Sequence, residues 1–454
     1  MKSTIFGLAS AAGRAGVSVF RVSGPDCNAV WRQLTRGKPE PPPRVATVTR
    51  LVGADDRVLD ECLALRFPAP ASFTGEDTLE LHVHGSPAVH EALAEALAAV
   101  EGVRMAHAGE FTRRAFVNQK MSLAEVEALS DLIQAETRAQ RVQALRQLSG
   151  ELGKLFEGWR KRLIGFLAHV EAVIDFADDE RIEAETYERV FPLAKELAEE
   201  MRAHLNDNRC GERIRSGVRV AVVGPPNSGK SSLYNALLRR NAAIVTDIPG
   251  TTRDVLEASL TVGEHLVCLV DTAGLRETSD TVEQLGIARS RQEFAGADER
   301  ILLLDARFSA LQAAEYTDQT VRPTLVALNK TDLLGSPAAV AAAVAHVAAA
   351  FPGVPVVAIS CLKQAVAPLI EQLSLQLGPA SYGAAPALTR PRHRAHLTAA
   401  CAQLEQFSES YARGVEVAAE DLREAVRQIA AISGHVTVDG DILDALFSEF
   451  CIGK

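Results

Sequence analysis

Between a short apolar run and a helical one, the chain carries a glycine-rich motif that constrains its fold more than any other feature. Residues 224–231 read Gly-Pro-Pro-Asn-Ser-Gly-Lys-Ser and fit the pattern G-x-x-x-x-G-K-[ST]. The β-branched run Val218–Val223 precedes the motif and predicts a buried strand, and Ser232–Leu238 follows it and predicts a helix. This order predicts an α/β nucleotide-binding domain. A chance glycine-rich turn is the alternative, and the flanking elements disfavour it.

The chemistry of this loop points to a bound phosphate. Its glycines let backbone N–H groups turn toward an anion, and the start of the following helix adds the positive end of a dipole. Lys230 can reach the β- and γ-phosphates of a nucleotide, and Ser231 can hold Mg²⁺. The predicted phosphate-binding residues are Asn227, Ser228, Gly229, Lys230, Ser231 and Ser232.

Two tetrapeptides downstream favour GTP as the nucleotide. Asp271-Thr272-Ala273-Gly274 follows the apolar run Leu266–Val270, where the aspartate can orient Mg²⁺ through water and the glycine N–H can sense the γ-phosphate. Asn329-Lys330-Thr331-Asp332 follows Thr324–Leu328, and Asp332 can accept two hydrogen bonds from the N–H and amino groups of guanine. Adenine lacks that donor pair and would leave the carboxylate unpaired, so we expect guanine selectivity.

A third motif and one departure complete the prediction of a GTPase. Gly250-Thr251-Thr252 lies between the first helix and the next strand of this domain, where Thr252 can complete the Mg²⁺ shell. Leu275 follows Gly274, where many Ras-like GTPases carry a glutamine that orients the attacking water. Leucine cannot orient water, so hydrolysis needs another water-positioning group and another source of positive charge. No arginine finger can be assigned from the sequence.

Composition bounds what surrounds this domain. A chain of 454 residues predicts roughly two to four domains. The net charge of −10 counts against a broad electrostatic grip on nucleic acid, although a local basic patch stays open. Seven scattered cysteines without a C-x-x-C pair favour reduced thiols. We find neither a signal-peptide pattern nor a run typical of a membrane span, so we expect a cytoplasmic protein without membrane contact.

The N-terminal part is predicted to be a mixed α/β domain over residues 1–118. Strand-like runs occur at Val17–Val22, Leu63–Phe67 and Thr78–Val83, and Val89–Val100 predicts a helix. His82 and His84 fall on one face of the last strand. A metal site there is conceivable, but two partly exposed histidines are favoured because no third ligand has recognisable spacing.

Helical periodicity marks two further segments, 119–212 and 381–454, on either side of the nucleotide-binding domain at 213–380. A helical region interrupted in this way predicts that its two parts pack together and that the nucleotide-binding domain is an insertion. Gly378–Arg392 is rich in Pro, Gly and Ala and is predicted to be a linker. The acidic residues in Asp175–Asp179 fit a solvated helix end better than a metal cluster.

Several longer motifs carry a family resemblance. They are Phe73-Thr74-Gly75-Glu76-Asp77, Gly109–Phe116, Asn241–Asp254, Asp271–Glu277 and the C-terminal Phe450-Cys451-Ile452-Gly453-Lys454. With them the chain resembles the MnmE (TrmE) family over essentially its whole length. The resemblance implies a multidomain fold, α/β plus all-α. It would comprise an N-terminal folate-binding-like domain that also dimerises, a helical domain from two segments, and an inserted Ras-like P-loop GTPase domain.

The resemblance also implies an activity. Members of this family are GTPase subunits of an enzyme that modifies C5 of the wobble uridine (U34) of tRNA. They add an aminomethyl-type group, carboxymethylaminomethyl, from a folate one-carbon donor, 5-formyl- or methylene-tetrahydrofolate. The implied partners are a second copy of the chain and a FAD-dependent MnmG-type protein, in a heterotetramer or larger complex that contacts tRNA. A regulatory switch GTPase of ribosome assembly is the alternative, and the N-terminal domain and C-terminal motif count against it.

Site residues follow from the same resemblance. A K⁺ ion at the phosphates would take the place of an arginine finger, and Glu283 would orient the attacking water, although sequence alone favours a solvated charge for Glu283. The implied K⁺ ligands are Asn227, Thr246, Thr251 and the backbone of Ile248. The implied nucleotide contacts are Thr246, Asp247, Ile248, Pro249, Gly250, Thr251 and Thr252, with Ser360, Cys361 and Leu362 at the guanine.

Folate would lie near Arg21, Glu80 and Lys120, with Lys454 close by. Cys451 would be near the one-carbon site, either as a catalytic thiol or as a small buried side chain. A purely dimerising N-terminal domain without folate is a further alternative. Two stretches depart from the family pattern, Ala11–Gly16 and Ser360–Lys363.

Overall fold

The structure is a computed structural model, and it describes residues 3–175, 180–240, 258–270, 296–307, 322–379, 386–434, 443, 446–448, 450 and 452–453. The chain divides into two compact units. The first unit comprises Met1–Gln134, Ala144–Ala203 and Arg392–Lys454, and the second comprises Ala135–Gln143 and His204–Pro391. The finer domain boundaries expected after residues 118, 212 and 380 stay predictions.

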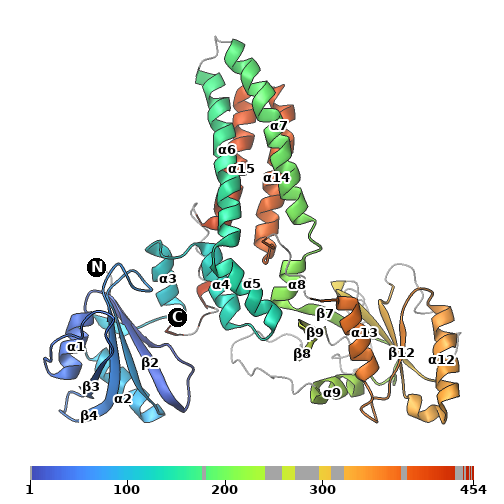
Figure 1. Cartoon of the computed structure of the whole chain (residues 1–454), viewed down its shortest axis with the longest axis horizontal. Helices are drawn as coiled ribbons and strands as arrows, with labels where there is room; N and C mark the ends of the chain where they lie inside the picture. The colour runs from blue at the N-terminus through green and yellow to red at the C-terminus, as the bar shows by residue number, and fades with distance from the viewer. Residues whose placement is uncertain are drawn as a thin grey trace, which may run out of the picture. The chain divides into compact units, whose positions relative to one another are not determined.

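The first unit contains a mixed sheet in the order β3-β4-β5-β2-β1-β6 (Figure 1). Its strands are β1 (Thr4–Leu8), β2 (Ala15–Ser23), β3 (Thr47–Val52), β4 (Val58–Phe67), β5 (Thr78–Gly85) and β6 (Val103–Met105). Only the β1–β6 pair is parallel among the described strands of this sheet. The three strands and the helix predicted in this region are confirmed.

Because side chains alternate along each strand, one face of this sheet is apolar and buried and the other carries polar side chains. Phe20, Val22 and Leu81 point to one face and pack with Trp31 of α1 (Cys27–Thr35) and Leu93 of α2 (Pro87–Ala98). The residues between them, including Arg21 and Glu80, therefore point to the opposite face. One face of the sheet is thus core, and the other is left for polar side chains.

Long helices make up the rest of the first unit. They are α3 (Glu110–Val117), α4 (Leu123–Ile133), α6 (Glu151–Asp175), α7 (Glu180–Leu205), α14 (Pro391–Tyr411) and α15 (Val415–Ser433), while α5 (Arg138–Leu148) is divided between the units. Phe191 of α7 stacks on Phe407 of α14 at 4.7 Å between ring centroids. Arg423 of α15 donates to Glu171 of α6 at 2.6 Å. The two helical segments therefore pack side by side, as predicted (Figure 1).

A buried charge cluster joins these two segments. Glu127 of α4 is 3% exposed and accepts from Arg392 Nε at 2.6 Å, and its second oxygen lies 3.0 Å from His393 Nε2. Burial alone would raise the pKa of the Glu127 carboxyl, but the charge and hydrogen bonds of His393 and Arg392 outweigh it and hold that pKa well below its usual range. The first turn of α14 is thereby fixed to α4.

The second unit contains a sheet in the order β12-β11-β10-β7-β9-β8. Its strands are β7 (Val218–Val223), β8 (Ala258–Val262), β9 (His265–Val270), β10 (Glu299–Asp305), β11 (Leu325–Asn329) and β12 (Val356–Ala358). Its helices are α8 (Cys210–Ser216), α9 (Lys230–Arg240), α12 (Pro337–Ala350) and α13 (Ala367–Leu377), with a 3-10 turn at Thr331–Leu334. All described pairs are parallel except β8–β9. This is the α/β domain that the glycine-rich motif predicted.

The predicted linker Gly378–Arg392 is partly wrong. Residues 380–385 lie outside the described part, but Leu388 and Thr389 are almost fully buried and α14 already begins at Pro391. Gly211 lies so close to this segment that a Cβ there would meet the Leu388 carbonyl oxygen at 2.4 Å. A run rich in Pro, Gly and Ala is equally suited to extended chain packed against a helix, and that is its state from residue 386. In the described residues no helix is long and apolar enough to cross a membrane.

Candidate functional site

The polar face of the first sheet carries a cross-strand ion pair. Arg21 on β2 lies directly opposite Glu80 on β5, and its Nη2 and Nε donate to Glu80 Oε1 at 2.9 and 3.0 Å. The guanidinium carbon of Arg21 lies 5.1 Å from the ring centre of Phe73 and 5.9 Å from that of Phe111. Both charged side chains are 16% exposed. The pair is therefore largely enclosed yet still reachable.

One loop brings Lys120 to the same face. Lys120 Nζ donates to the carbonyl of Pro70 at 3.0 Å, and its stem packs against Gly75. The same loop, residues 68–77, supplies Phe73 under the Arg21 guanidinium. Three of the four residues predicted to surround folate are thus gathered around a single loop.

The C-terminal tail lies on this face as well. Gly7 of β1 pairs with Arg21, so the two residues point to the same side of the sheet. A Cβ on Gly7 would meet the Cα of Gly453 at 3.1 Å, and Ile452 forms an isolated bridge with Ala108. Gly453 has φ +101°, and a Cβ there would meet the Leu8 carbonyl oxygen at 2.2 Å. The tail therefore docks through glycines, while Cys451 and Lys454 lie outside the described residues.

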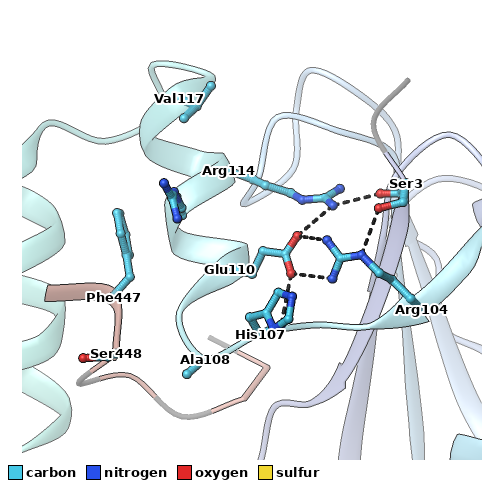
Figure 2. A pocket seen from close by; sticks show the side chains of 10 residues that line it. Ser3, Arg104, His107, Ala108, Glu110, Arg114, Val117, Phe447 and Ser448 are labelled. Carbon is cyan, nitrogen blue, oxygen red and sulfur yellow. Dashed lines mark hydrogen bonds and ion pairs between the residues drawn. The ribbon is translucent and has the colours of Figure 1, made fainter. Parts of the chain in front are cut away.

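A cavity of about 690 Å³ opens beside the docked tail (Figure 2). Glu110 of α3 accepts from both nitrogens of the Arg104 fork, at 2.6 and 2.9 Å, and from Arg114, which also donates to Glu76. Burial would raise the pKa of the Glu110 carboxyl, but the hydrogen bonds from Arg104, the His107 N–H and Arg114 lower that pKa to about 2. Two guanidinium groups are thus matched by two carboxylates, and this network fixes α3 to the sheet. The lining residues are Ser3, Arg104, His107, Ala108, Glu110, Arg113, Arg114, Val117, Phe447 and Ser448.

His82 and His84 each have a carboxylate neighbour. His82 Nε2 lies 3.5 Å from Glu80 Oε2, and His84 Nδ1 lies 2.8 Å from Asp60 Oδ1. The described residues contain no group of three or more His, Cys, Asp or Glu side chains that could hold a metal.

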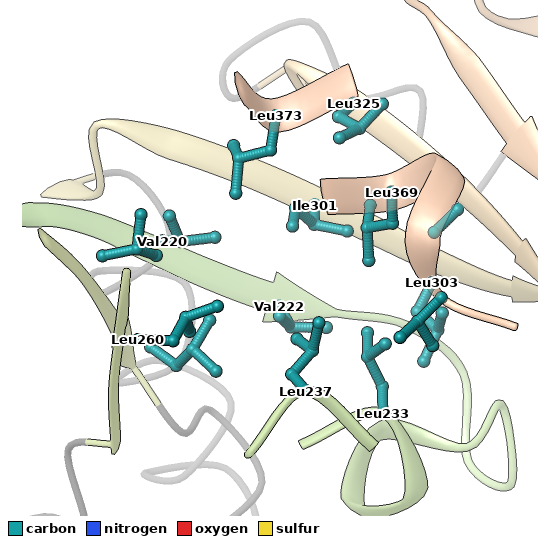
Figure 3. Packing of buried hydrophobic residues seen from close by; sticks show 14 of the residues in the cluster. Val220, Val222, Leu233, Leu237, Leu260, Ile301, Leu303, Leu325, Leu369 and Leu373 are labelled. Carbon is teal, nitrogen blue, oxygen red and sulfur yellow. The ribbon is translucent and has the colours of Figure 1, made fainter. Parts of the chain in front are cut away.

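In the second unit, close backbone approach shapes the loop between β7 and α9. The strands beneath it form an apolar core with α9 and α13 (Figure 3). A Cβ on Gly224 would meet the Leu303 carbonyl oxygen at 2.1 Å, and one on Gly229 would meet Asn329 Nδ2 at 2.4 Å. Gly229 and Asn227 have φ of +100° and +61°. Glycine is therefore required at positions 224 and 229 for the loop to lie on the carboxyl end of the sheet.

This loop presents donors suited to phosphate. Lys230, the first residue of α9, donates from Nζ to the carbonyls of Gly224 and Pro225 at 2.8 and 3.1 Å. The Ser228 hydroxyl is buried, and among the described residues it has no hydrogen-bond partner. Ser231 and Ser232 are exposed in the first turn of α9. An ammonium, hydroxyls and the N–H groups of a helix start make a donor set that fits phosphate oxygens.

The segment Asn329–Asp332 ties this loop to its neighbours. Asn329 is 2% exposed, donates to the Ser228 carbonyl at 2.9 Å and accepts from the Cys361 N–H at 3.1 Å. The Ser360 hydroxyl donates to Asp332 Oδ1. Asn329, Asp332 and the 360–362 segment therefore meet at one point beside the phosphate loop.

Two side chains of the 360–362 segment differ sharply in exposure. Leu362 is 83% exposed, whereas Cys361 is buried. Burial raises the pKa of the Cys361 thiol to about 11. Cys361 is thus a neutral structural thiol, and its backbone N–H donates to Asn329. The departure from the family pattern at Ser360–Lys363 leaves this hydrogen bonding in place.

Other predicted site residues lie outside the described part of the chain. They are Thr246, Asp247, Ile248, Pro249, Gly250, Thr251, Thr252, Asp271, Thr272, Ala273, Gly274, Glu283, Cys451 and Lys454. Of the predicted Mg²⁺ and K⁺ ligands, the structure describes Ser231 and Asn227. The motifs that lie within the described residues meet at the carboxyl ends of β7, β10 and β11.

Comparison with known proteins settles the family. The model of the MnmE helical domain matches residues 123–451, and that of the GTP-binding protein TrmE N-terminus matches residues 4–120. The chain belongs to the MnmE family. The two family models, with the two sheets and the long helices, confirm the predicted class, multidomain α/β plus helical.

Relatives match over all or nearly all of their length. The tRNA modification GTPase MnmE of Paramagnetospirillum magneticum is 45% identical over 456 residues, covering 100% of both chains. That of Parvibaculum lavamentivorans is 46% identical, covering 99% of this chain and 100% of the relative. The mitochondrial 5-taurinomethyluridine-[tRNA] synthase subunit GTPB3 of Rattus norvegicus is 44% identical, covering 100% and 93%. Among solved structures, a variant of Era from Aquifex aeolicus is 25% identical over 41% of this chain and 66% of that chain, with a TM-score of 0.30.

Membership of the MnmE family makes the chain a tRNA modification GTPase, as predicted, and counts against the ribosome-assembly alternative. Sequence reasoning missed two features of its sites. Asp305 contacts the base motif, and its signal was an aspartate ending the apolar run Ile301–Leu304. The Arg104–Glu110–Arg114 network gave no signal beyond the family motif Gly109–Phe116, because its members meet only in the folded chain.

Proposed function

We propose that this chain is the GTP-hydrolysing subunit of an enzyme that modifies C5 of the wobble uridine of tRNA. It would add an aminomethyl-type group, carboxymethylaminomethyl, from a folate one-carbon donor. The observation that carries the proposal is the convergence of Arg21, Glu80, Lys120 and the C-terminal tail on one face of the N-terminal sheet. A GTPase that only switched partners would have no need of this enclosed polar face.

The residues on this face suit a folate. The Glu80 carboxylate can accept hydrogen bonds from the N–H and amino groups of a pterin ring, and Arg21 holds that carboxylate in place. Phe73 and Phe111 supply flat apolar surface beside the guanidinium. The exposed Lys120 ammonium can pair with the glutamate carboxylates of folate. The folate would supply the one-carbon unit as 5-formyl- or methylene-tetrahydrofolate, with Lys454 and Cys451 near it.

The nucleotide site would work by positioning and charge. Asp332 would select guanine, Lys230 would contact the phosphates, and Ser231 with Thr252 would hold Mg²⁺. K⁺ would be held by Asn227, Thr246, Thr251 and the Ile248 backbone, and it would supply the positive charge that an arginine finger gives elsewhere. Glu283 would orient the attacking water, the task that Leu275 cannot perform.

Modification requires partners. We infer a homodimer, because the family resemblance implies an N-terminal domain that dimerises. A FAD-dependent MnmG-type partner would form a heterotetramer or larger complex with this dimer, and tRNA would bind mainly through that complex. The rat relative is itself named as a synthase subunit, which supports a multi-protein enzyme. We expect the complex in the cytoplasm.

Matched variants of two ion pairs in one sheet test the folate proposal. Glu80→Gln should abolish tight binding of 5-formyltetrahydrofolate by the full chain, measured by titration calorimetry. Glu61→Gln changes another cross-strand Arg–Glu pair, with Arg50, which is more than half exposed. This control should bind folate like the wild type. Equal folate affinity in the two variants would remove the Glu80 site, and no folate binding by the wild type would overturn the proposed chemistry.

A further inference from the structure

Asp305 ends β10 at the place where the phosphate loop and the base motif meet. It lies opposite Asn329, the last residue of β11, in the parallel register, and Lys330 follows Asn329 directly. Asp305 Oδ2 lies 2.9 Å from Lys330 Nζ, and its side chain is 23% exposed. Arg307 holds the carboxylate from the other side, with its N–H and Nε at 3.0 and 3.1 Å from Oδ1 and its Nη2 at 3.0 Å from Oδ2. Lys330 and Arg307 therefore hold the Asp305 carboxylate in one orientation.

Lys330 carries this constraint to the phosphate loop. Its Nζ also donates to the carbonyl of Asn227 at 2.6 Å. Lys330 and Asn227 both have left-handed backbones, with φ of +62° and +61°. Such conformations are costly for residues other than glycine and persist where surrounding contacts hold them. One ammonium thus bridges two strained turns, one in each nucleotide-binding motif.

The charge of Asp305 suits this task. The hydrogen bonds from Arg307, and then those from Lys330, hold the pKa of the Asp305 carboxyl well below its usual range. Asp305 is therefore ionised throughout the physiological pH range and attracts the Lys330 ammonium continuously. Without that attraction, the long lysine side chain would be free to leave the Asn227 carbonyl for solvent.

We propose that Asp305 is a positioning residue for the guanine nucleotide. It holds Lys330 on the Asn227 carbonyl and so fixes the distance between the base-recognising segment and the phosphate loop before nucleotide binds. This inference rests on the proposed nucleotide site. Because the base and the α- and β-phosphates are present in both GTP and GDP, Asp305 contributes to the affinity for the two nucleotides alike and little to the hydrolysis step.

Binding and single-turnover measurements on the full chain test this role. Asp305→Ala should weaken GTP and GDP by the same factor, about 3- to 30-fold, the range expected for loss of one partly exposed charge-assisted hydrogen bond. The hydrolysis rate at saturating GTP should stay near that of the wild type. Arg307→Ala is the matched control, since it removes the other cation but keeps the Asp305–Lys330–Asn227 chain. It should retain most of the affinity.

A double-mutant cycle separates positioning from general destabilisation. If Asp305 acts through Lys330, then Asp305→Ala should add nothing in a Lys330→Ala background. Additive losses, or a fall in the saturated rate with unchanged affinity, would overturn the inference. Asp305→Asn, which keeps the shape, guards against misfolding and should reproduce the affinity loss in part. If wild-type protein fails to bind guanine nucleotides, the proposed nucleotide site fails; if it binds them and Asp305→Ala binds them equally well, only this inference fails.

Discussion

Replacing Gly453 by alanine should release the C-terminal tail from the N-terminal sheet. The added Cβ would lie 2.2 Å from the carbonyl oxygen of Leu8, 2.5 Å from its carbonyl carbon and 2.8 Å from the nitrogen of Ala9. All three are backbone atoms of the sheet or of the residue after it, so none can move aside by a change of rotamer. The only relief is movement of the tail itself.

The magnitude follows from two contributions. A non-glycine residue at φ +101° carries backbone strain of about 1–3 kcal/mol. Lifting the tail off Leu8 also breaks the bridge between Ile452 and Ala108, whose hydrogen bonding is worth about 0.5–1.5 kcal/mol net. Together they amount to about 1.5–4.5 kcal/mol, or roughly 10- to 2,000-fold in the docking equilibrium.

If the docked tail is part of the folate site, the apparent folate Kd should rise once the docked state becomes the minority. Titration of the full-length variant with 5-formyltetrahydrofolate measures this loss, and hydrogen exchange at the Ile452 and Gly453 amides reports docking independently. The affinity for GTP should be unchanged, because the nucleotide site lies in the other unit.

Other glycines give a graded series. Gly109→Ala should act like Gly453→Ala, since its Cβ would meet the Phe447 carbonyl oxygen at 2.3 Å, and Gly7→Ala should act more weakly because its nearest contact is 3.1 Å. Gly37→Ala is the control, with φ +77° but no atom within 4 Å of its Cβ. A tail that stays protected from exchange in Gly453→Ala would refute the packing argument. A released tail with unchanged folate affinity would refute its place in the folate site.

Three further outcomes are expected. Asp332→Asn replaces an acceptor by a mixed donor and acceptor, so GTP should bind more weakly and xanthosine triphosphate more tightly; unchanged GTP affinity would remove the assignment. Glu127→Gln leaves the largely enclosed Arg392 without its carboxylate partner and should lower the free energy of unfolding by about 3–5 kcal/mol at neutral pH. Because the pKa of Glu127 is lower in the folded protein, the stability difference between wild type and variant should be full above pH 4.5, the ordinary pKa of a glutamate, and should shrink as the pH falls below it. Urea unfolding at a series of pH values measures this difference. Hydrolysis by the wild type should be faster in KCl than in NaCl at equal ionic strength, and Asn227→Ala should abolish this difference. Glu283→Ala should lower kcat without changing nucleotide affinity. Equal wild-type rates in both salts would exclude the potassium role.

Local patterns predicted the elements and the nucleotide motifs well. Val218–Val223 is β7, and Thr324–Leu328 is β11 shifted by one residue. These strands could be predicted because the conformation of a short β-branched or apolar run depends mainly on residues next to it in the sequence. The motif residues at 227–232 and 329–332 then meet because parallel strands end at the same edge of a sheet. Motif order along the chain was therefore enough to place them.

Contacts between distant segments could not be read in the same way. Gly7, Gly109 and Gly453 are ordinary glycines in the sequence, and only the folded chain shows that each is needed where the tail lies against backbone. Asp305 only ends an apolar run in the sequence, and its partner Lys330 directly follows the neighbouring strand of the sheet. The Gly378–Arg392 error has the same origin, since composition reports flexibility of the free chain and says nothing of what Leu388 packs against.

The most direct test of the proposed function is mass spectrometry of tRNA nucleosides from cells that lack this protein. Cells complemented with the wild-type chain should carry an aminomethyl-type group at C5 of the wobble uridine in certain tRNAs, and cells without it should carry unmodified or partly modified uridine there. Complementation with Lys230→Ala should not restore the modification, because this variant loses a nucleotide contact. A chain without Cys451–Lys454 should not restore it either, although its GTP affinity is kept. An unchanged nucleoside profile in the deletion strain would contradict the assignment of this chain to wobble-uridine modification.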